Sequence, residues 1–372
     1  MATKKPPESI FRKAFPSLED LLGFLRDCEC CEVKYHLIKR PKKGGGVRII
    51  YSPSEKLKIV QEEILSIISH WYVDVCQFGF IKRKSCRDNT RYHIHEYEAK
   101  TRRWKKMLVK AVPVWMVKID IKDAFPSVKS KHLRILFKDI FSPLLKNAFS
   151  EISLKENEKI YNNLVNQFTR LTTYRRKLPQ GAPCSPYLFN LVLSRGGIIE
   201  KIKKKCGERA KKRRKGCQIT PFKPSVYADD IVITSLKDRI SNRFIREIIE
   251  IIESDGIFKI NPDKIRRSSL KYKAHKITGI VLDDRWINGV VGHITLPQKV
   301  RGTYRGKLHR ATAILLTGRL PSKEKDGLSI EQALGIIARI RDVFQKQFLP
   351  SDLKLIVHNF EETWKEFRRE IL

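Results

Sequence analysis

Residues 225–234 read SVYADDIVIT, in which Asp229 and Asp230 stand between two short β-rich runs. This pattern predicts a β-hairpin with carboxylates at its turn. Residues 114–120 read VWMVKID, an apolar run that predicts a buried strand ending at Asp120. Because a strand end and a tight turn can bring distant segments together, the three carboxylates could share one site. Two Mg²⁺ ions about 3.5–4 Å apart need such bridging carboxylates in phosphoryl transfer.

Each of these carboxylates also has an ordinary structural interpretation. An Asp-Asp pair is common in hairpin turns because Asp tolerates turn geometry. Taken alone, the YADD sequence at 227–230 favours that structural role, and Asp120 alone is no better. The sequence around them therefore decides whether they are catalytic.

The charge of the chain indicates a polyanionic partner. Its 372 residues include 76 Lys and Arg against 40 Asp and Glu, a net charge of +36 spread along the chain. Nucleic acid is the first candidate for such a partner. No apolar run approaches the roughly 20 residues that span a bilayer, and the first residues do not resemble a secretory signal. We therefore expect a cytoplasmic protein with no membrane partner.

The order of predicted elements is mixed first and helical later. Residues 34–52 contain two β-type runs around three glycines, which predicts a hairpin with a basic tip. A helix is expected at 246–254 and a single strand at 277–282. From about residue 296 the apolar spacing is helical to the end of the chain.

Three motifs give the chain a family resemblance. DIKDAF at 120–125, LPQGAPCSP at 178–186 and YADD at 227–230 resemble, in this order, the A, B and C motifs of reverse transcriptases. The resemblance covers roughly residues 35–310. Retron-type bacterial reverse transcriptases are the subgroup that it indicates.

Two further motifs support the retron subgroup. FGF at 78–80, followed by Asn89-Thr90-Arg91-Tyr92-His93, is similar to the retron Asn-Ala-x-x-His signature. Ile277-Thr278-Gly279 is similar to the retron Val-Thr-Gly triplet. Each departs by one residue, Thr90 for Ala and Ile277 for Val.

The resemblance implies an α+β fold, a right-hand polymerase with fingers, a ferredoxin-like palm and a helical thumb. The fingers would comprise residues 1–113, with N-terminal helices and the basic hairpin. The palm would comprise 114–295, with fingers-type insertions and a basic loop at 201–215. The thumb would comprise 296–372.

The resemblance also implies the catalytic roles. Asp120 and Asp229 would bind two Mg²⁺ ions, Asp230 would support them, and the Ile121 carbonyl would be a further ligand. Lys264 matches the motif D lysine, which could protonate the leaving pyrophosphate if its pKa is tuned toward the working pH.

The nucleotide site is implied by motifs A and B and by the hairpin. Phe125 stands where the family places a steric gate, a ring that collides with a ribose 2′-hydroxyl and so selects deoxynucleotides. Backbone N–H groups of Asp123 and Ala124 would bind the triphosphate. Gln180 and Gly181 begin a small-residue turn whose backbone can approach the nucleotide and the template closely. The hairpin's candidate for the triphosphate is Arg48, although a solvated surface role is also open.

Candidate nucleic-acid contacts lie on four basic or polar segments, three of which also have a structural interpretation. Residues 201–215 carry ten Lys or Arg, which favours RNA binding by counterion release over a merely solvated loop. Trp104 lies among basic residues and could stack a base or anchor packing. Asn89 and His93 would share one helix face and contact RNA, or form a core polar pair. The named candidates are Asn89, His93, Trp104, Lys211, Lys212, Arg213, Arg214, Arg301 and Arg305.

These features predict an RNA-directed DNA polymerase that extends a primer from dNTPs. Its partners would be a noncoding RNA serving as template and primer, the cDNA product and a separate effector protein, in an anti-phage system that makes single-stranded msDNA. A group II intron-type enzyme is the first alternative, although the tail after residue 296 has no Cys for an added endonuclease. An RNA-dependent RNA polymerase would favour Gly over Ala228 and a smaller residue than Phe125. A non-catalytic RNA-binding scaffold would have lost carboxylates that this chain keeps.

Overall fold

The computed structural model describes residues 15–41, 45–71, 73–100, 106–148, 153–211, 222–283, 293–344 and 349–371. The chain forms two compact units. Unit 1 comprises 1–84, 117–235 and 239–267, and unit 2 comprises 85–116, 236–238 and 268–372. Among the described residues, no helix is long and apolar enough to cross a membrane.

Unit 1 is built on a five-stranded sheet with the order β6-β7-β5-β8, in which β9 also pairs with β5. Its central strand β5 alternates, because Val117, Ile119 and Ile121 are buried while Lys118 and Asp120 are partly exposed on the opposite face. The strands are β5 (Trp115–Lys122), β6 (Lys223–Tyr227), β7 (Asp230–Ser235), β8 (Lys259–Ile260) and β9 (Arg266–Ser269).

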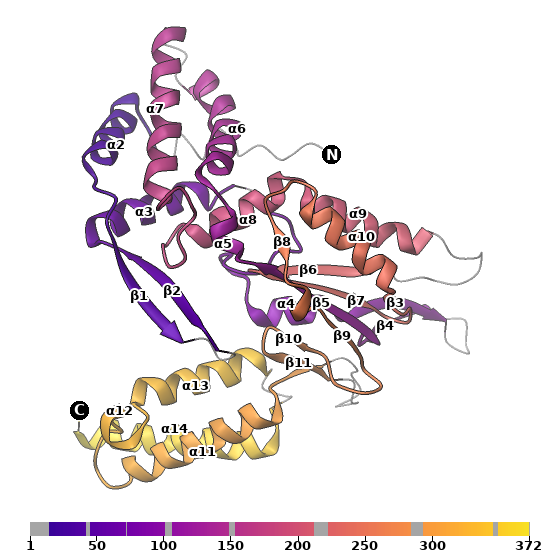
Figure 1. Ribbon diagram of the computed structural model, residues 1–372. Helices are drawn as coiled ribbons and strands as arrows, with labels where there is room; N and C mark the ends of the chain where they lie inside the picture. The colour runs from indigo at the N-terminus through magenta and orange to yellow at the C-terminus, as the bar shows by residue number, and fades with distance from the viewer. Residues whose placement is uncertain are drawn as a thin grey trace. The chain divides into compact units, whose positions relative to one another are not determined.

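Helices and one hairpin complete unit 1 (Figure 1). Helices α6 and α7 lie side by side, and Phe137, Phe141 and Phe168 join them through edge-on and stacked ring contacts. The helices are α2 (Leu18–Cys30), α3 (Glu55–Ile68), α5 (Ala124–Ser127), α6 (Ser130–Ala148), α7 (Leu154–Thr172), α8 (Ser185–Arg195), α9 (Ile198–Lys211), α10 (Asn242–Glu253) and the 3₁₀ turn η1 (Pro262–Lys264). The hairpin consists of β1 (Tyr35–Pro41) and β2 (Val47–Pro53).

Unit 2 combines two small sheets with the helical end of the chain. β3 pairs with β4, and β10, β11 and β12 form a three-stranded sheet. Its elements are α4 (Cys86–Tyr92), β3 (His95–Lys100), β4 (Lys106–Ala111), β10 (Lys276–Ile277), β11 (Ile280–Asp283), β12 (His293–Thr295), α11 (Gln298–Leu315), α12 (Lys323–Asp326), α13 (Ile330–Val343) and α14 (Ser351–Ile371).

Most predicted elements are confirmed, and two are corrected. The hairpins at 34–52 and 225–234, the helix near 246–254 and the helical tail are present. The strand predicted at 277–282 is a hairpin instead, because Thr278 (φ 46°) and Gly279 (φ 86°) adopt the left-handed conformation that a two-residue turn requires.

The basic loop predicted at 201–215 is wrong over its first part. Residues 201–211 continue α9, because Ile198, Ile202 and Cys206 are buried at helical spacing. Residues 212–221 lie outside the described residues. The mixed helix-and-sheet fold is as expected, whereas the fingers, palm and thumb boundaries remain predictions, and the two units cut across them.

Candidate active site

The backbone brings the end of β5 to the turn between β6 and β7. The Ile121 amide donates a hydrogen bond to the Asp229 carbonyl at 2.9 Å, and the Asn261 amide donates to the Asp120 carbonyl at 2.9 Å. Tyr227 pairs with Asp230, so Ala228 and Asp229 form the turn itself, with Ala228 at φ 55°. Burial raises the pKa of Asp229, and the negative charges of Asp230 and Asp120 raise it further. The structure therefore places the three predicted carboxylates in one electrostatic cluster.

Two lysine ammonium groups neutralise this cluster. Lys264 Nζ lies 2.9 Å from Asp120 Oδ2, and Lys118 Nζ lies 2.6 Å from Asp230 Oδ2. The hydrogen bond to Asp120 raises the pKa of Lys264, which is opposite to the tuning toward working pH that the sequence suggested. Lys118 was missed, although the signal was present. It is the polar interruption of an apolar strand, two residues from Asp120 and therefore on the same face.

The donors fit magnesium by their chemistry but are not arranged as a ready-made cage. Carboxylate oxygens from Asp120 and Asp229 are the hard ligands that Mg²⁺ prefers. Among the described residues, no group of three or more His, Cys, Asp or Glu side chains is placed to hold a metal ion. Asp230 instead faces Lys118. A cation beside Asp229 would relieve the like-charge repulsion that raises its pKa.

An aromatic cluster borders the carboxylates. The Phe125 ring is half-buried, with its centroid 5.5 Å from that of Phe189 and 6.5 Å from that of Phe80. Phe80 is 49% exposed and also lies 6.5 Å from the Tyr227 ring. Asp123 has φ 45° and immediately precedes the short helix α5, which begins at Ala124. Phe80 therefore connects the proposed gate residue to Tyr227 of the YADD segment.

The segment before Phe80 supports the carboxylate turn, a role that sequence reasoning missed. The Phe78 amide donates to the Val226 carbonyl at 2.8 Å, so this segment extends the edge of the sheet at β6. A Cβ on Gly79 would lie 2.5 Å from the Ala228 nitrogen, so only glycine fits there. Asn190, in α8, donates to the Gly79 carbonyl at 2.7 Å. The FGF motif had been noted only as a family signature.

Motif B packs against the hairpin. The Tyr51 amide donates to the Gln180 carbonyl at 2.8 Å. A Cβ on Gly181 (φ 118°) would lie 2.6 Å from Ile50 Cγ2, so β2 packs closely against this glycine, and its approach to nucleotide and template remains a prediction. Arg48 is exposed and lies directly opposite Arg40 on β1. Among the described residues neither arginine forms an ion pair, and Arg40 was not predicted.

Comparison with known proteins assigns the family. Residues 40–282, about two-thirds of the chain, match the family model described as "Reverse transcriptase (RNA-dependent DNA polymerase)". The chain belongs to the reverse transcriptase family.

Curated relatives refine this assignment. The Retron Ec83 reverse transcriptase of Escherichia coli is 25% identical over 74% of this chain and 75% of its own length. The Retron Ec73 reverse transcriptase of Escherichia coli is 27% identical over 81% of both chains. The Retron Mx162 reverse transcriptase of Myxococcus xanthus is 25% identical over 81% of this chain and 56% of its own. The protein is thus a retron-type reverse transcriptase, a nucleotidyltransferase that makes DNA on an RNA template.

Among solved structures, the telomerase from Candida albicans in complex with a fragment of telomeric RNA covers 90% of this chain and 56% of its own. Its TM-score is 0.44 at 11% identity, which is too weak to support an argument.

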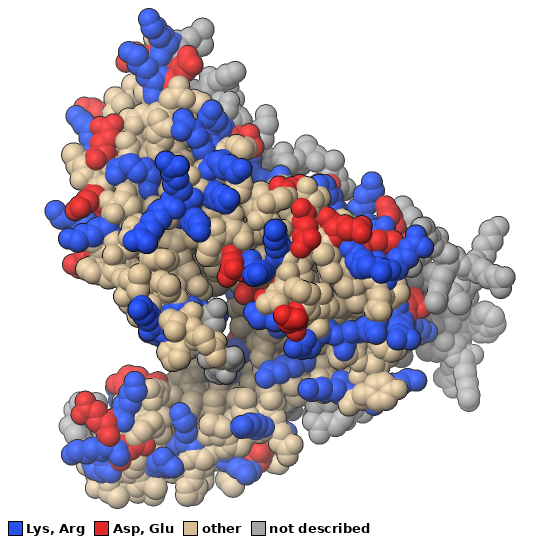
Figure 2. Space-filling model, in the orientation of Figure 1, with Lys and Arg blue, Asp and Glu red and all other residues tan. Residues whose placement is uncertain are grey.

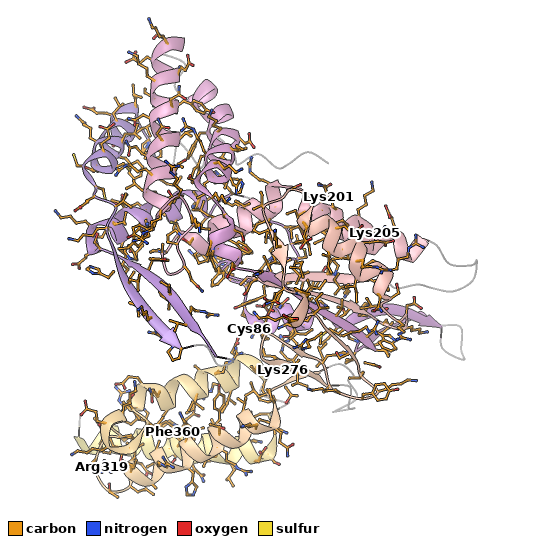
Figure 3. The ribbon with its side chains drawn as sticks, in the orientation of Figure 1. Cys86, Lys201, Lys205, Lys276, Arg319 and Phe360 are labelled. Carbon is orange, nitrogen blue, oxygen red and sulfur yellow. The ribbon has the colours of Figure 1, made fainter. Side chains whose placement is uncertain are left out.

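Several lysines of the predicted basic loop of this reverse transcriptase form ion pairs within the fold. Lys201 and Lys205, labelled on α9 in Figure 3, lie 3.6 Å from Asp255 and 3.2 Å from Glu247. Lys203 pairs with Asp74 at 2.9 Å. Lys211 is the last residue of α9, and its side chain lies outside the described residues. The other predicted nucleic-acid contacts in such segments, Lys212, Arg213, Arg214 and Trp104, also lie outside the described residues.

The retron-like motifs in unit 2 face the interior. Asn89 and His93 are both 0% exposed, as expected for polar residues in the core, and their contact with RNA remains a prediction. Thr90 Oγ1 donates to the Ile277 carbonyl at 3.1 Å, and Thr278 Oγ1 donates to the carbonyl of Cys86, labelled in Figure 3, at 3.2 Å. The two positions that depart from the retron signatures therefore touch each other.

The two arginines predicted to bind nucleic acid near the start of the helical tail, Arg301 and Arg305, differ in their surroundings. Arg301 is half-buried in α11, whereas Arg305 is exposed and lies 3.6 Å from Asp352 of α14. Arg305 thus has an intramolecular partner that nucleic acid would have to replace. Their role in binding nucleic acid remains a prediction.

Proposed function

We propose that this reverse transcriptase copies a dedicated noncoding RNA into single-stranded msDNA by two-metal nucleotidyl transfer, as part of an anti-phage defence system. The observation that carries the catalytic part is the cluster at Asp229, whose pKa is raised by its burial and by Asp230 and Asp120. Clustered carboxylates that repel one another are the arrangement that bound cations stabilise. The retron names of the curated relatives support the msDNA part.

In the proposed mechanism, Asp120 and Asp229 would hold two Mg²⁺ ions, and the Ile121 carbonyl would be a further ligand. The ions would supply charge neutralisation at the triphosphate and activation of the primer hydroxyl. Lys264, whose ammonium group contacts Asp120 at 2.9 Å, would donate a proton to the leaving pyrophosphate. Asp230 remains a supporting carboxylate, held in place by Lys118.

The nucleotide is positioned by groups around this centre. Phe125 excludes a 2′-hydroxyl, and the amides of Asp123 and Ala124 face the triphosphate. Arg48 binds phosphate oxygens, together with Arg40 opposite it, because two facing arginines without a carboxylate partner favour an anion between them. Gln180 and Gly181 complete the site through their contact with β2.

The nucleic acid that copurifies with the protein tests the retron part. We expect RNA covalently branched to DNA from the wild-type protein, and RNA alone from the Asp229→Ala/Asp230→Ala variant. A spliced intron from the wild-type protein would instead favour a group II intron-type enzyme. DNA in equal amount from the double variant would favour a non-catalytic scaffold that binds a product made elsewhere. A separate effector protein is expected to appear in the same preparation.

A further inference from the structure

A strained turn in unit 1 carries two adjacent arginines. The amides and carbonyls of Tyr174 and Lys177 exchange hydrogen bonds of 2.8 and 3.0 Å, so Arg175 and Arg176 are the central residues of a two-residue β-turn. Arg175 has φ 49° and Arg176 has φ 60°. Turns with positive φ at both positions strongly prefer Asn-Gly or Gly-Gly, because a Cβ is crowded there. Two arginines are therefore kept where the backbone disfavours them.

The turn is held rigidly by its neighbours. The Leu178 amide donates to the Val128 carbonyl at 2.9 Å, and the Ser130 amide donates to the Arg176 carbonyl at 2.9 Å. The Tyr174 ring lies 4.9 Å from Tyr35 and 5.2 Å from Tyr51, at the base of the β1–β2 hairpin. Strained backbone of this kind persists where the surroundings enforce it, and it clusters at functional sites.

The surface around the turn is positively charged. Arg175, Arg176 and Lys177 are exposed, and exposed Lys129 pairs with Lys177 through an isolated β-bridge. Lys131 is exposed beside them. Among the residues that the structure describes, none of these five forms an ion pair with a carboxylate. Figure 2 shows Lys and Arg side chains gathered over the end of α7 and beside α5.

The same positive charges also act on the neighbouring His132 side chain. Burial lowers the pKa of His132, and the positive charges of Lys131 and Lys129 lower it further. The local potential is therefore positive even within the fold. Arg175 lies over the Tyr174 ring at 5.4 Å, but none of the five cations has a carboxylate partner among the described residues, and clustered charge of one sign attracts a polyanion.

We propose that Arg175 and Arg176, with Lys129, Lys131 and Lys177, bind the phosphate backbone of the single-stranded template ahead of the nucleotide site. The five cations come from two chain segments that lie side by side, which suits an extended strand. The turn leads directly into Gln180, and Val128 ends the helix that begins beside Phe125, so a strand bound here passes close to the proposed nucleotide pocket. The identity of the strand as template rests on the proposed function, whereas its binding does not.

The test is a double substitution that removes both the backbone strain of the turn and its two positive charges. In the variant Arg175→Asn/Arg176→Gly, the turn has the sequence that its geometry prefers, so the melting temperature should rise or stay constant. Two probes are compared: an RNA template annealed to a DNA primer with a single-stranded template overhang, and a blunt duplex of the same sequence. Affinity for the overhang probe should fall, with the slope of log K against log[salt] reduced by about 1.4 for two lost contacts to a single strand. Affinity for the blunt duplex should not change.

Two further variants serve as controls. Lys155→Gln/Lys159→Gln removes the same charge from exposed positions at the opposite end of α7, roughly 20 Å away at 1.5 Å per residue, and should leave the slope unchanged. Arg175→Lys/Arg176→Lys keeps the charge and should retain the slope.

Three results would overturn the proposal. Unchanged affinity for the overhang probe would show that the arginines bind no strand. Equal loss on both probes would assign the turn to the duplex. A raised KM for dNTP at unchanged RNA affinity would assign it to the nucleotide. If the wild-type protein binds the overhang through this turn but makes no DNA, the proposed function fails and the binding site stands.

Discussion

The family motifs of this reverse transcriptase occupy opposite environments in its two units. In unit 1, Asp120, Asp229 and Asp230 stay partly exposed and are matched by lysine ammonium groups. In unit 2, Asn89 and His93 are fully buried, and Thr90 joins α4 to β10 through one hydrogen bond. A family motif can therefore mark chemistry in one place and packing in another. Solvent access separates the two, and a motif alone does not reveal it.

The largest effect on activity is expected at Gly79, which packs against the turn that carries the carboxylates. In Gly79→Ala, the new Cβ would lie 2.5 Å from the Ala228 nitrogen, a backbone atom that cannot yield without moving the carboxylate turn. Overpacking of this kind costs about 1–3 kcal/mol. A displacement of about 1 Å at a reacting group can lower the rate about a hundredfold. Primer-extension rates and denaturant unfolding measure the two effects.

The matched control is Gly207→Ala in α9, where nothing lies within 4 Å of the added Cβ. It should stabilise the protein by up to about 1 kcal/mol without changing the rate. Full activity in Gly79→Ala would show that the FGF segment does not support the turn.

A smaller effect, on stability alone, is expected in unit 2. Thr90→Val removes a hydroxyl that donates to the Cys86 carbonyl at 2.9 Å and the Ile277 carbonyl at 3.1 Å, all in a buried setting. We expect a loss of about 1–2 kcal/mol in the free energy of unfolding, with an unchanged rate of primer extension. Thr303→Val, on the exposed surface of α11, should change stability by less than about 0.5 kcal/mol. Lost RNA affinity at wild-type stability would instead make the buried cluster functional.

The smallest effect concerns the partly buried ion pair between Asp74 and Lys203. Asp74 accepts hydrogen bonds from Lys203 Nζ at 2.9 Å and from the Cys76 amide at 3.0 Å. Burial alone would raise the pKa of Asp74, but these hydrogen bonds outweigh burial and lower it. The ionised carboxylate therefore stabilises the fold above its unfolded pKa of about 3.9, and this contribution is lost as the pH falls through the lower folded value.

Asp74→Asn should accordingly lower the melting temperature at pH 7, and the gap to the wild-type protein should narrow at acid pH. The exposed Asp27→Asn variant should show no such gap. A gap that stays constant down to pH 3 would mean that the charge of Asp74 does not contribute.

The local sequence pattern was enough to predict the strand and the hairpin that carry Asp120 and Asp229. Alternation in β5 and the turn at Ala228 place Asp120 and Asp229 where the motifs expect them. The same alternation places Lys118 beside Asp230, and it could have been predicted with closer attention to which face each residue occupies.

Contacts between distant segments of the chain could not be predicted from the sequence. The fit of Gly79 against Ala228 depends on the approach of segments about 150 residues apart, and no local pattern encodes it. Likewise, a polar Asn89 on an amphipathic helix gives no sign that a strand near residue 277 will cover that helix. The basic run after residue 201 indicated a loop because its charge masked the buried stripe of α9.

The central claim is that the carboxylate cluster at the β6–β7 turn polymerises DNA on RNA. Its most direct test is extension of a DNA primer on an RNA template with dNTPs and Mg²⁺, with RNA binding measured in parallel. The wild-type protein should extend the primer, and Asp229→Ala/Asp230→Ala should lose extension while keeping most of its RNA affinity. Extension by the double variant at the wild-type rate would contradict the assignment.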